Sequence, residues 1–172
     1  VPSPGATVGP ASTSTSAPAA SAPVTLEPAP ATPEPSAPPP DPTPPPPVAA
    51  TLSLGDGPPL EAEVGSYTID GFGSDSPWLP ASSLEQIVSV NVGSELRIRL
   101  DGDPPIEQWS VSAARADDTH ADRLIGLGDG DAAPQGDAVV VAAPPAGDWV
   151  VMASVRFAGG SGAYYWHVIV TE

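Results

Sequence analysis

Residues 148–171 read DWVVMASVRFAGGSGAYYWHVIVT, and this stretch decides the fold. Its first half is apolar at every second position from Trp149 to Phe157. Because alternate residues of a β-strand point to the same face, this pattern predicts a strand that brings two aromatic rings to a core. The glycine-rich connection AGGSG after it is typical of a hairpin turn.

The second half of the stretch predicts a partner strand with two different faces. Tyr164 and Trp166 share one face with two valines, and Tyr165 and His167 lie on the other. We therefore expect Trp166 to be core material. We expect His167 to lie on the opposite side of the sheet and not in a pocket shared with Trp166.

Shorter stretches of alternating or β-branched residues fill the rest of residues 50–172, separated by turn-forming Gly, Asp and Pro. No sustained helical period appears, so these residues predict an all-β, immunoglobulin-like antiparallel β-sandwich of about seven or eight strands, with an open barrel as the competing architecture. Trp109, Trp149 and Trp166 are expected in its core. The further strand candidates are LEAEV, SYTID, IVSVNV, SELRIRLDGD, EQWSVSAA, RLIGL and DAVVVAA.

Residues 1–49 differ sharply in composition from residues 50–172. They hold 17 of the 26 prolines and no aromatic residue, so they cannot bury enough apolar surface to offset the entropy of ordering. Their proline block favours the extended polyproline II conformer. We predict a disordered linker or stalk over residues 1–49 and a folded domain over residues 50–172.

The charge of the chain limits the classes of partner that it is expected to bind. It carries 21 acidic residues, five arginines and no lysine, for a net charge of −16. Nucleic acid and anionic membrane surfaces are therefore not expected as partners, because both are bound through clustered cations. The chain has no cysteine and no apolar run of the ~20 residues that cross a membrane. We expect no cofactor, with Ca²⁺ in an acidic loop as the one weak candidate.

Two stretches resemble a known class of domain. PPAGDWVVMASVRFAGGSGAYYWHVIV is similar to the last strands of bacterial immunoglobulin-like domains, with Pro144, Gly147 and Trp149 matching a Pro-x-x-Gly-x-aromatic step. GSYTIDGFGSDSPWLP looks like part of an uncharacterised domain of secreted and lipid-anchored bacterial proteins, in which the Gly-Ser-Tyr and Ser-Pro-Trp elements are often joined by paired cysteines. This chain has none. The resemblance implies no known activity and no catalytic residues.

Acidic loops offer weak candidates for metal ligands. One loop holds Asp117, Asp118 and His120, followed by Asp122, and a second holds Asp129, Asp131 and Asp137. Oxygen donors of this kind suit Ca²⁺, but neither spacing matches an EF-hand, and the competing interpretation is an Asp/Gly turn that bonds its own backbone. The pair Asp70 and Asp75 is weaker still.

Candidates for catalysis and ligand binding are few. Ser161 lies in GGSGA, which departs from the G-x-S-x-G nucleophile motif and is better explained by the hairpin. We therefore expect a non-enzyme. Trp78, Tyr67 and Phe72 are the weak candidates for an exposed aromatic platform that stacks on a ligand.

These observations favour a non-catalytic extracytoplasmic module, secreted or anchored at the surface of a bacterium and displayed on a Pro-rich stalk. Its expected role is recognition or spacing, as a monomer, with a protein or glycan of the envelope as partner. The chain begins with Val1 and not with Met. We therefore expect that a leader has been removed, and the module is expected to be lipid-anchored through a cysteine upstream of Val1. The alternative is a carbohydrate- or calcium-binding accessory module of a secreted system.

Overall fold

The computed structural model describes residues 45–55, 57–133 and 138–172, and confirms an all-β sandwich of two sheets. The predicted linker over residues 1–49 lies almost wholly outside the described residues and stays a prediction. A single 3-10 turn, η1 (Ala81–Ser83), interrupts the strands in the described ranges. The strands are β1 (Ala50–Leu54), β2 (Leu60–Glu61), β3 (Glu63–Ile69), β4 (Phe72–Ser74), β5 (Ile87–Asn91), β6 (Glu95–Leu100), β7 (Ile106–Arg115), β8 (Ile125–Gly130), β9 (Ala138–Ala142), β10 (Gly147–Phe157) and β11 (Gly160–Thr171).

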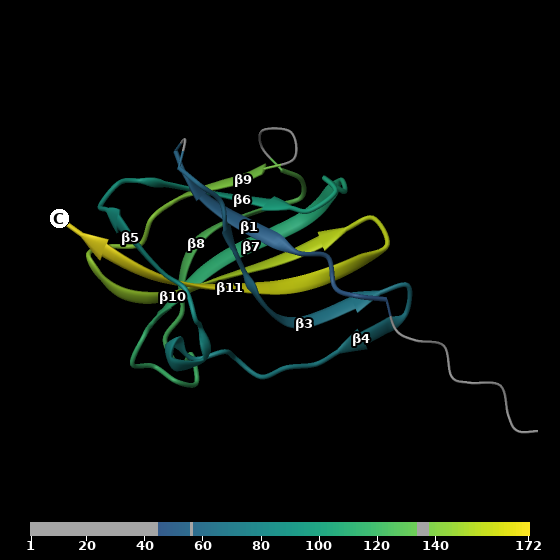
Figure 1. Cartoon of the computed structure of the whole chain (residues 1–172), viewed down its shortest axis with the longest axis horizontal. Helices are drawn as coiled ribbons and strands as arrows, with labels where there is room; N and C mark the ends of the chain where they lie inside the picture. The colour runs from purple at the N-terminus through teal and green to yellow at the C-terminus, as the bar shows by residue number, and fades with distance from the viewer. Residues whose placement is uncertain (1–44, 56, 134–137) are drawn as a thin grey trace, which may run out of the picture. The chain divides into compact units, whose positions relative to one another are not determined.

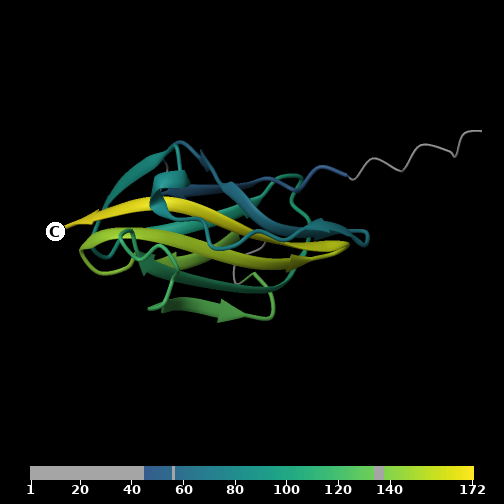
Figure 2. The same ribbon diagram turned by 90° about the horizontal axis from the view of Figure 1, so that it is seen from below.

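The two sheets differ in size. The four-stranded sheet has the order β2-β1-β6-β9, and the seven-stranded sheet has the order β4-β3-β11-β10-β7-β8, with β5 added beside β11. Figure 1 shows β10 and β11, the longest strands, side by side in yellow-green and yellow. The view turned by 90° shows strands of the seven-stranded sheet side by side, from the yellow β11 and yellow-green β10 to the green β8 at the bottom (Figure 2).

The β10–β11 hairpin places the two predicted core faces opposite each other. It pairs Gly147 with Val170 at one end and Phe157 with Gly160 at the other, which leaves a two-residue turn. Gly159 in that turn has a φ of 90°, a conformation that favours glycine. All the residues predicted on the core face of the hairpin are buried: Trp149, Val151, Ala153, Val155, Phe157, Tyr164, Trp166, Val168 and Val170.

Two details of the sheet differ from the sequence-based expectation of seven or eight antiparallel strands. The described residues form eleven strands, because β2 and β4 have only two and three residues and are too short to show an alternation. β5 runs parallel to β11. β3 pairs with residues 160–165 of β11 and leaves the rest of that edge free, so β5 occupies residues 167–171 of the same edge.

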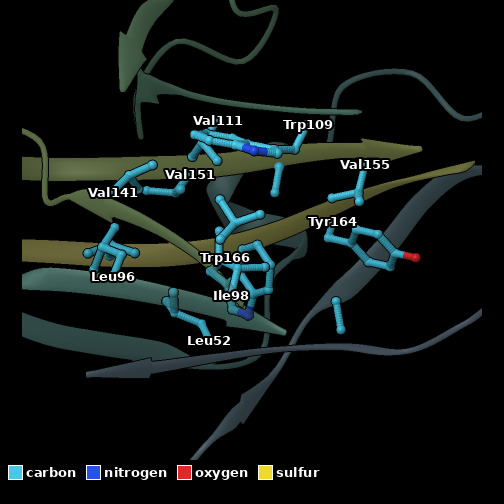
Figure 3. Close-up of a cluster of buried hydrophobic side chains, with 14 of the residues drawn as sticks. Leu52, Leu96, Ile98, Trp109, Val111, Val141, Val151, Val155, Tyr164 and Trp166 are labelled. Carbon is cyan, nitrogen blue, oxygen red and sulfur yellow. The ribbon is translucent and has the colours of Figure 1, made fainter. Parts of the chain in front are cut away.

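The core lies between the two sheets (Figure 3). Trp109, Trp149 and Trp166 are buried there, as predicted, with exposed fractions of 6%, 5% and 4%. Each indole N–H donates to a backbone carbonyl, so burial leaves no indole of the three unpaired. The Trp109 indole donates to Ala132 at 2.7 Å, that of Trp149 to Pro145 at 2.7 Å, and that of Trp166 to Leu60 at 3.2 Å.

The Pro-x-x-Gly-x-aromatic step has a packing explanation. Pro144 is fully buried, and the guanidinium of Arg115 lies 4.2 Å from the centre of the Trp149 ring. Gly147, with a φ of 144°, leaves the space that this guanidinium occupies. The step therefore seats a cation on the aromatic ring at the start of β10.

Candidate functional site

The outer face of the seven-stranded sheet, opposite the core, is half covered. A crossing segment, residues 75–86, lies against the middle of this face and forms a second apolar cluster. In that cluster Leu84 packs with Val150 and Tyr165, and the Trp78 ring meets the Tyr165 ring edge-on, with centroids 5.3 Å apart and planes at 85°. Trp78 is therefore mainly a packing residue, and its indole Nε1 is buried without a hydrogen-bond partner among the described residues.

Ser66 fastens the crossing segment to β3. Its hydroxyl donates to the backbone oxygen of Ser76 at 3.0 Å and accepts from the backbone N–H of the same residue at 2.9 Å. These bonds join the Gly-Ser-Tyr and Ser-Pro-Trp elements, which paired cysteines often join in the domains that this region resembles. The cysteine-free chain thus holds the same two elements together with hydrogen bonds.

Replacing Ser66 with alanine is expected to destabilise the domain by about 1–2 kcal/mol. The substitution removes two hydrogen bonds and leaves a partly buried backbone N–H and C=O without their partner. Urea unfolding measures the loss. Ser82→Ala, an exposed serine of the same segment, is the control and should change stability by no more than about 0.5 kcal/mol. Equal effects of the two variants would contradict the role given to Ser66.

His167 lies on the outer face, away from Trp166, as the strand parity predicts. Its Nε2 donates to the Oδ1 of Asp148 at a distance of 2.6 Å. The His167 side chain is 11% exposed and that of Asp148 is 54% exposed. Ser161 and His167 are six residues apart on β11, which at ~3.3 Å per residue separates them by about 20 Å. They cannot form a nucleophile–base pair.

In the first predicted acidic loop, an aspartate side chain forms hydrogen bonds with the backbone of the same loop. The carboxylate of Asp118 accepts hydrogen bonds from the backbone N–H groups of Asp122 at 3.1 Å, Arg123 at 3.0 Å and His120 at 3.4 Å. Partial desolvation acts to raise the pKa of Asp118, but these N–H groups together outweigh it and hold the pKa below its ordinary value. His120 is exposed, and its Nδ1 lies 3.0 Å from the hydroxyl of Thr119.

The glycines of the second acidic loop serve the core. A Cβ on Gly128 would lie 3.3 Å from the Trp109 ring, and one on Gly130 would lie 3.0 Å from its Nε1. Asp129 stands between them on β8 and is exposed, as is Asp131. Asp137 lies outside the described residues, so the Asp129, Asp131 and Asp137 site stays a prediction. Within the described ranges, no three His, Asp or Glu side chains come together in a group that could hold a metal.

The outer face is hollowed near the β10–β11 turn, where its exposed side chains are mostly polar. A depression of about 340 Å³ opens beside Ser154 of β10 and Ser161 of β11. We call it the polar depression. The cross-strand register brings residues of four neighbouring strands to it: Ser110 lies opposite both Asp129 and Ser154, and Arg156 lies opposite both Gln108 and Ser161. Its polar lining is Gln108, Ser110, Asp129, Asp131, Ser154, Arg156 and Ser161.

A second depression, of about 180 Å³, continues the first. It shares Ser154 and Ser161 with the polar depression and extends over β3, where Tyr67 takes part in its lining together with Asp75 of the crossing segment. Of the aromatic candidates, Tyr67 therefore lines a hollow and Trp78 packs on Tyr165. Phe72 is 41% exposed on β4, where it pairs with Ile69 of β3. The structure does not bring these three rings together as one platform.

Other hollows lie on the connection between β7 and β8. Two depressions of about 400 Å³ each are lined by Arg115 and Asp117, one with Asp148 and the other with Asp118, Asp122 and Arg123. They mix arginines with carboxylates, so neither presents one sign of charge. The polar depression differs because paired strands fix its side chains, and sites on regular elements hold their geometry better than sites on loops.

Most residues of the polar depression were missed from the sequence. Gln108, Ser110, Ser154 and Arg156 occupy the polar positions of strands whose apolar positions predicted the core. The sequence signal for these residues was the polar positions of each alternating strand. These positions could not show which strands lie side by side in the sheet.

The chain was compared with known proteins. No family model and no curated protein matches it. Solved structures that resemble it include the catalytic domain of an LPMO from Listeria monocytogenes (13% identity, 51% of this chain, 61% of that chain, TM-score 0.41) and an LPMO from Kitasatospora papulosa (13%, 51%, 52%, 0.40). A third is a lytic polysaccharide monooxygenase from Jonesia denitrificans (10%, 61%, 77%, 0.37). The chain thus spans less than two thirds of the first two, and no property of these proteins is transferred to it. The bacterial immunoglobulin-like family stays a prediction, whereas the β-sandwich is confirmed.

Proposed function

We propose that the chain is a non-catalytic recognition module that works outside the cytoplasm. Its β-sandwich is displayed on the Pro-rich segment, residues 1–49, and binds its ligand on the open half of the outer face of the seven-stranded sheet. One observation carries the proposal. The crossing segment covers the apolar middle of this face, whereas the polar half beside the β10–β11 turn is left open and hollowed.

The absence of catalysis in this proposal rests on the distances between reactive groups. The described residues contain two histidines: His167 is held by Asp148 about 20 Å along β11 from Ser161, and His120 is exposed on the β7–β8 connection. A hydrolytic site needs a nucleophile and a base within hydrogen-bond reach. No histidine lies among the residues that line the polar depression.

Display at the cell surface is supported by composition. The proline block of residues 1–49 favours an extended chain that separates a domain from its point of attachment. No helix within the described residues is long and apolar enough to cross a membrane. Attachment through an anchor that precedes Val1 remains part of the proposal.

Labelling of intact cells tests the location. The full chain, tagged after Glu172 and produced in its source bacterium, should be reached by an antibody without permeabilisation. Confinement of the tag to the cytoplasm would overturn the extracytoplasmic part of the proposal.

Co-sedimentation of the purified chain with envelope fragments of the same bacterium tests recognition. The wild-type chain should bind saturably, and Ser154→Trp, which fills the polar depression, should weaken binding at least tenfold. Ser89→Trp is the matched control, because Ser89 is an exposed serine of the same sheet paired with Ile169, far from the depression. Equal binding by both variants would contradict the assigned face, and release of soluble fragments from the envelope would contradict a non-catalytic role.

A further inference from the structure

We infer that the polar depression binds an uncharged glycan chain. This inference rests on the proposed function and names the ligand class of the same face. Its starting point is the set of side chains at the hollow: the carboxylate of Asp129, the amide of Gln108 and the guanidinium of Arg156, with three serine hydroxyls between them.

These groups complement sugar hydroxyls. A carboxylate, an amide and a guanidinium each present two polar atoms side by side, which suits a pair of neighbouring hydroxyl groups. A sugar hydroxyl both donates and accepts, so it pairs with the acceptor-only Asp129 and with the donor-only Arg156. A ligand with only donors or only acceptors would leave one of the two side chains unpaired.

The charge around the depression excludes anionic ligands. Arg156 is the single cation of the lining, and its Nε lies 3.6 Å from the Oε2 of Glu107. Asp129 and Asp131 add negative charge to a chain whose net charge is already −16. Anionic polysaccharide and phosphate-rich polymers are therefore repelled and not attracted.

Apolar ligands and protein partners fit less well than a glycan. The large apolar side chains that are exposed in the described residues lie elsewhere: Phe72, Ile87, Val92 and Leu124. A stable protein interface buries about 800 Å² on each partner around aromatic or arginine anchors in desolvated pockets. The polar depression offers one arginine, already exposed and beside a glutamate, and its one aromatic residue, Trp109, is buried with an exposed fraction of 6%.

The extent of the hollow indicates a polymer. The polar depression and the depression next to it share Ser154 and Ser161, and together they cross β8, β7, β10, β11 and β3. Four interstrand spacings of ~4.8 Å give a track of about 19 Å, longer than one sugar ring. Tyr67 lies at the β3 end of this track.

Affinity gel electrophoresis tests the inference with the full chain. The probes are four soluble uncharged polysaccharides (dextran, glucomannan, arabinoxylan and hydroxyethyl cellulose) and one anionic polysaccharide, polygalacturonate. At least one uncharged probe should retard the wild-type chain. Ser154→Trp should raise the apparent Kd at least tenfold, Gln108→Ala and Asp129→Ala should each raise it several-fold, and Ser89→Trp should leave it unchanged. Near-identical circular dichroism and melting curves show that the variants fold.

The outcomes separate the two proposals. No retardation by any uncharged probe, or retardation by polygalacturonate alone, overturns the glycan inference. The recognition function can survive that result. It stands, with a protein as the ligand, if Ser154→Trp still weakens binding to envelope fragments and protease treatment of the fragments abolishes binding. The inference is also overturned if a glycan retards the Ser154→Trp and Ser89→Trp variants equally, because the glycan then binds outside the polar depression.

Discussion

Replacing Trp166 with alanine is expected to lower the free energy of unfolding by about 3–5 kcal/mol, the range measured when a large aromatic side chain is removed from a core. Trp166 is 4% exposed and lies between the two sheets (Figure 3). Its Nε1 also donates to the carbonyl of Leu60 in β2, so the substitution removes a bond between strands of different sheets. Domains of this size are stable by about 5–15 kcal/mol, so the loss is a large fraction of the total stability. Urea or guanidinium unfolding, followed by circular dichroism, measures the change.

Two control variants test how the stabilisation by Trp166 depends on the size of its side chain, on its hydrogen bond and on its position in the fold. Trp166→Phe keeps a six-membered aromatic ring but loses the N–H and the rest of the five-membered ring, so it should cost less than Trp166→Ala. Trp78→Ala removes the same side chain from the crossing segment, where the indole is partly exposed and its N–H has no partner among the described residues, and should also cost clearly less. A loss below about 1 kcal/mol for Trp166→Ala would place this residue outside a packed core.

The hairpin shows what local sequence can determine. Strand parity places Trp149 and Trp166 in the core and His167 on the other face, because these residues belong to two long strands joined by a two-residue turn. In strands with this period-two alternation, a one-residue slip in register would turn the rings to the other face. The fold class followed from this stretch and from the shorter strands that repeat its pattern.

The crossing segment shows where local sequence fails. Nothing in the sequence of residues 75–86 indicates that they cover Tyr165, which is about 80 positions away, or that β5 then returns parallel to β11. Both features depend on which part of an edge β3 leaves unpaired. The hydrogen bonds between Ser66 and Ser76 likewise could not be predicted, because they depend on β3 and the crossing segment lying side by side.

The polar depression has the same origin. Ser154 and Ser161 belong to one hairpin, and their shared face could be read from its register. Ser110 and Asp129 reach the same surface because β7 pairs with β10 and β8 with β7, which are contacts between distant segments. A single sequence gives the polar positions of each strand but not the order of the strands in the sheet.

Gly128→Val is the second substitution with a large expected effect, a destabilisation of about 3 kcal/mol. A Cβ at this position would already lie 3.2 Å from the Cγ1 of Val141 and 3.3 Å from the Trp109 ring. The two further methyl groups of valine must push the indole of Trp109 away, and Trp109 is fixed by its bond to the carbonyl of Ala132. Overpacking of a closed core costs about 1–3 kcal/mol, and here it adds to the strain on that bond.

Gly126→Val is the matched control, because a Cβ at Gly126 meets nothing within 4 Å. A bulge between these two glycines puts Gly128 opposite Val111, on the core face, and Gly126 opposite Ser112, on the outer face. Valine at position 126 should therefore leave stability unchanged or raise it by a few tenths of a kcal/mol, because valine favours strands. The quenching of Trp fluorescence by acrylamide should rise in the folded state for Gly128→Val alone. If both variants were equally stable, the glycines of β8 would not be there to admit the Trp109 ring. Melting curves with Ca²⁺ and with EDTA test the predicted calcium loop separately, and a bound ion would appear as a shift of several degrees.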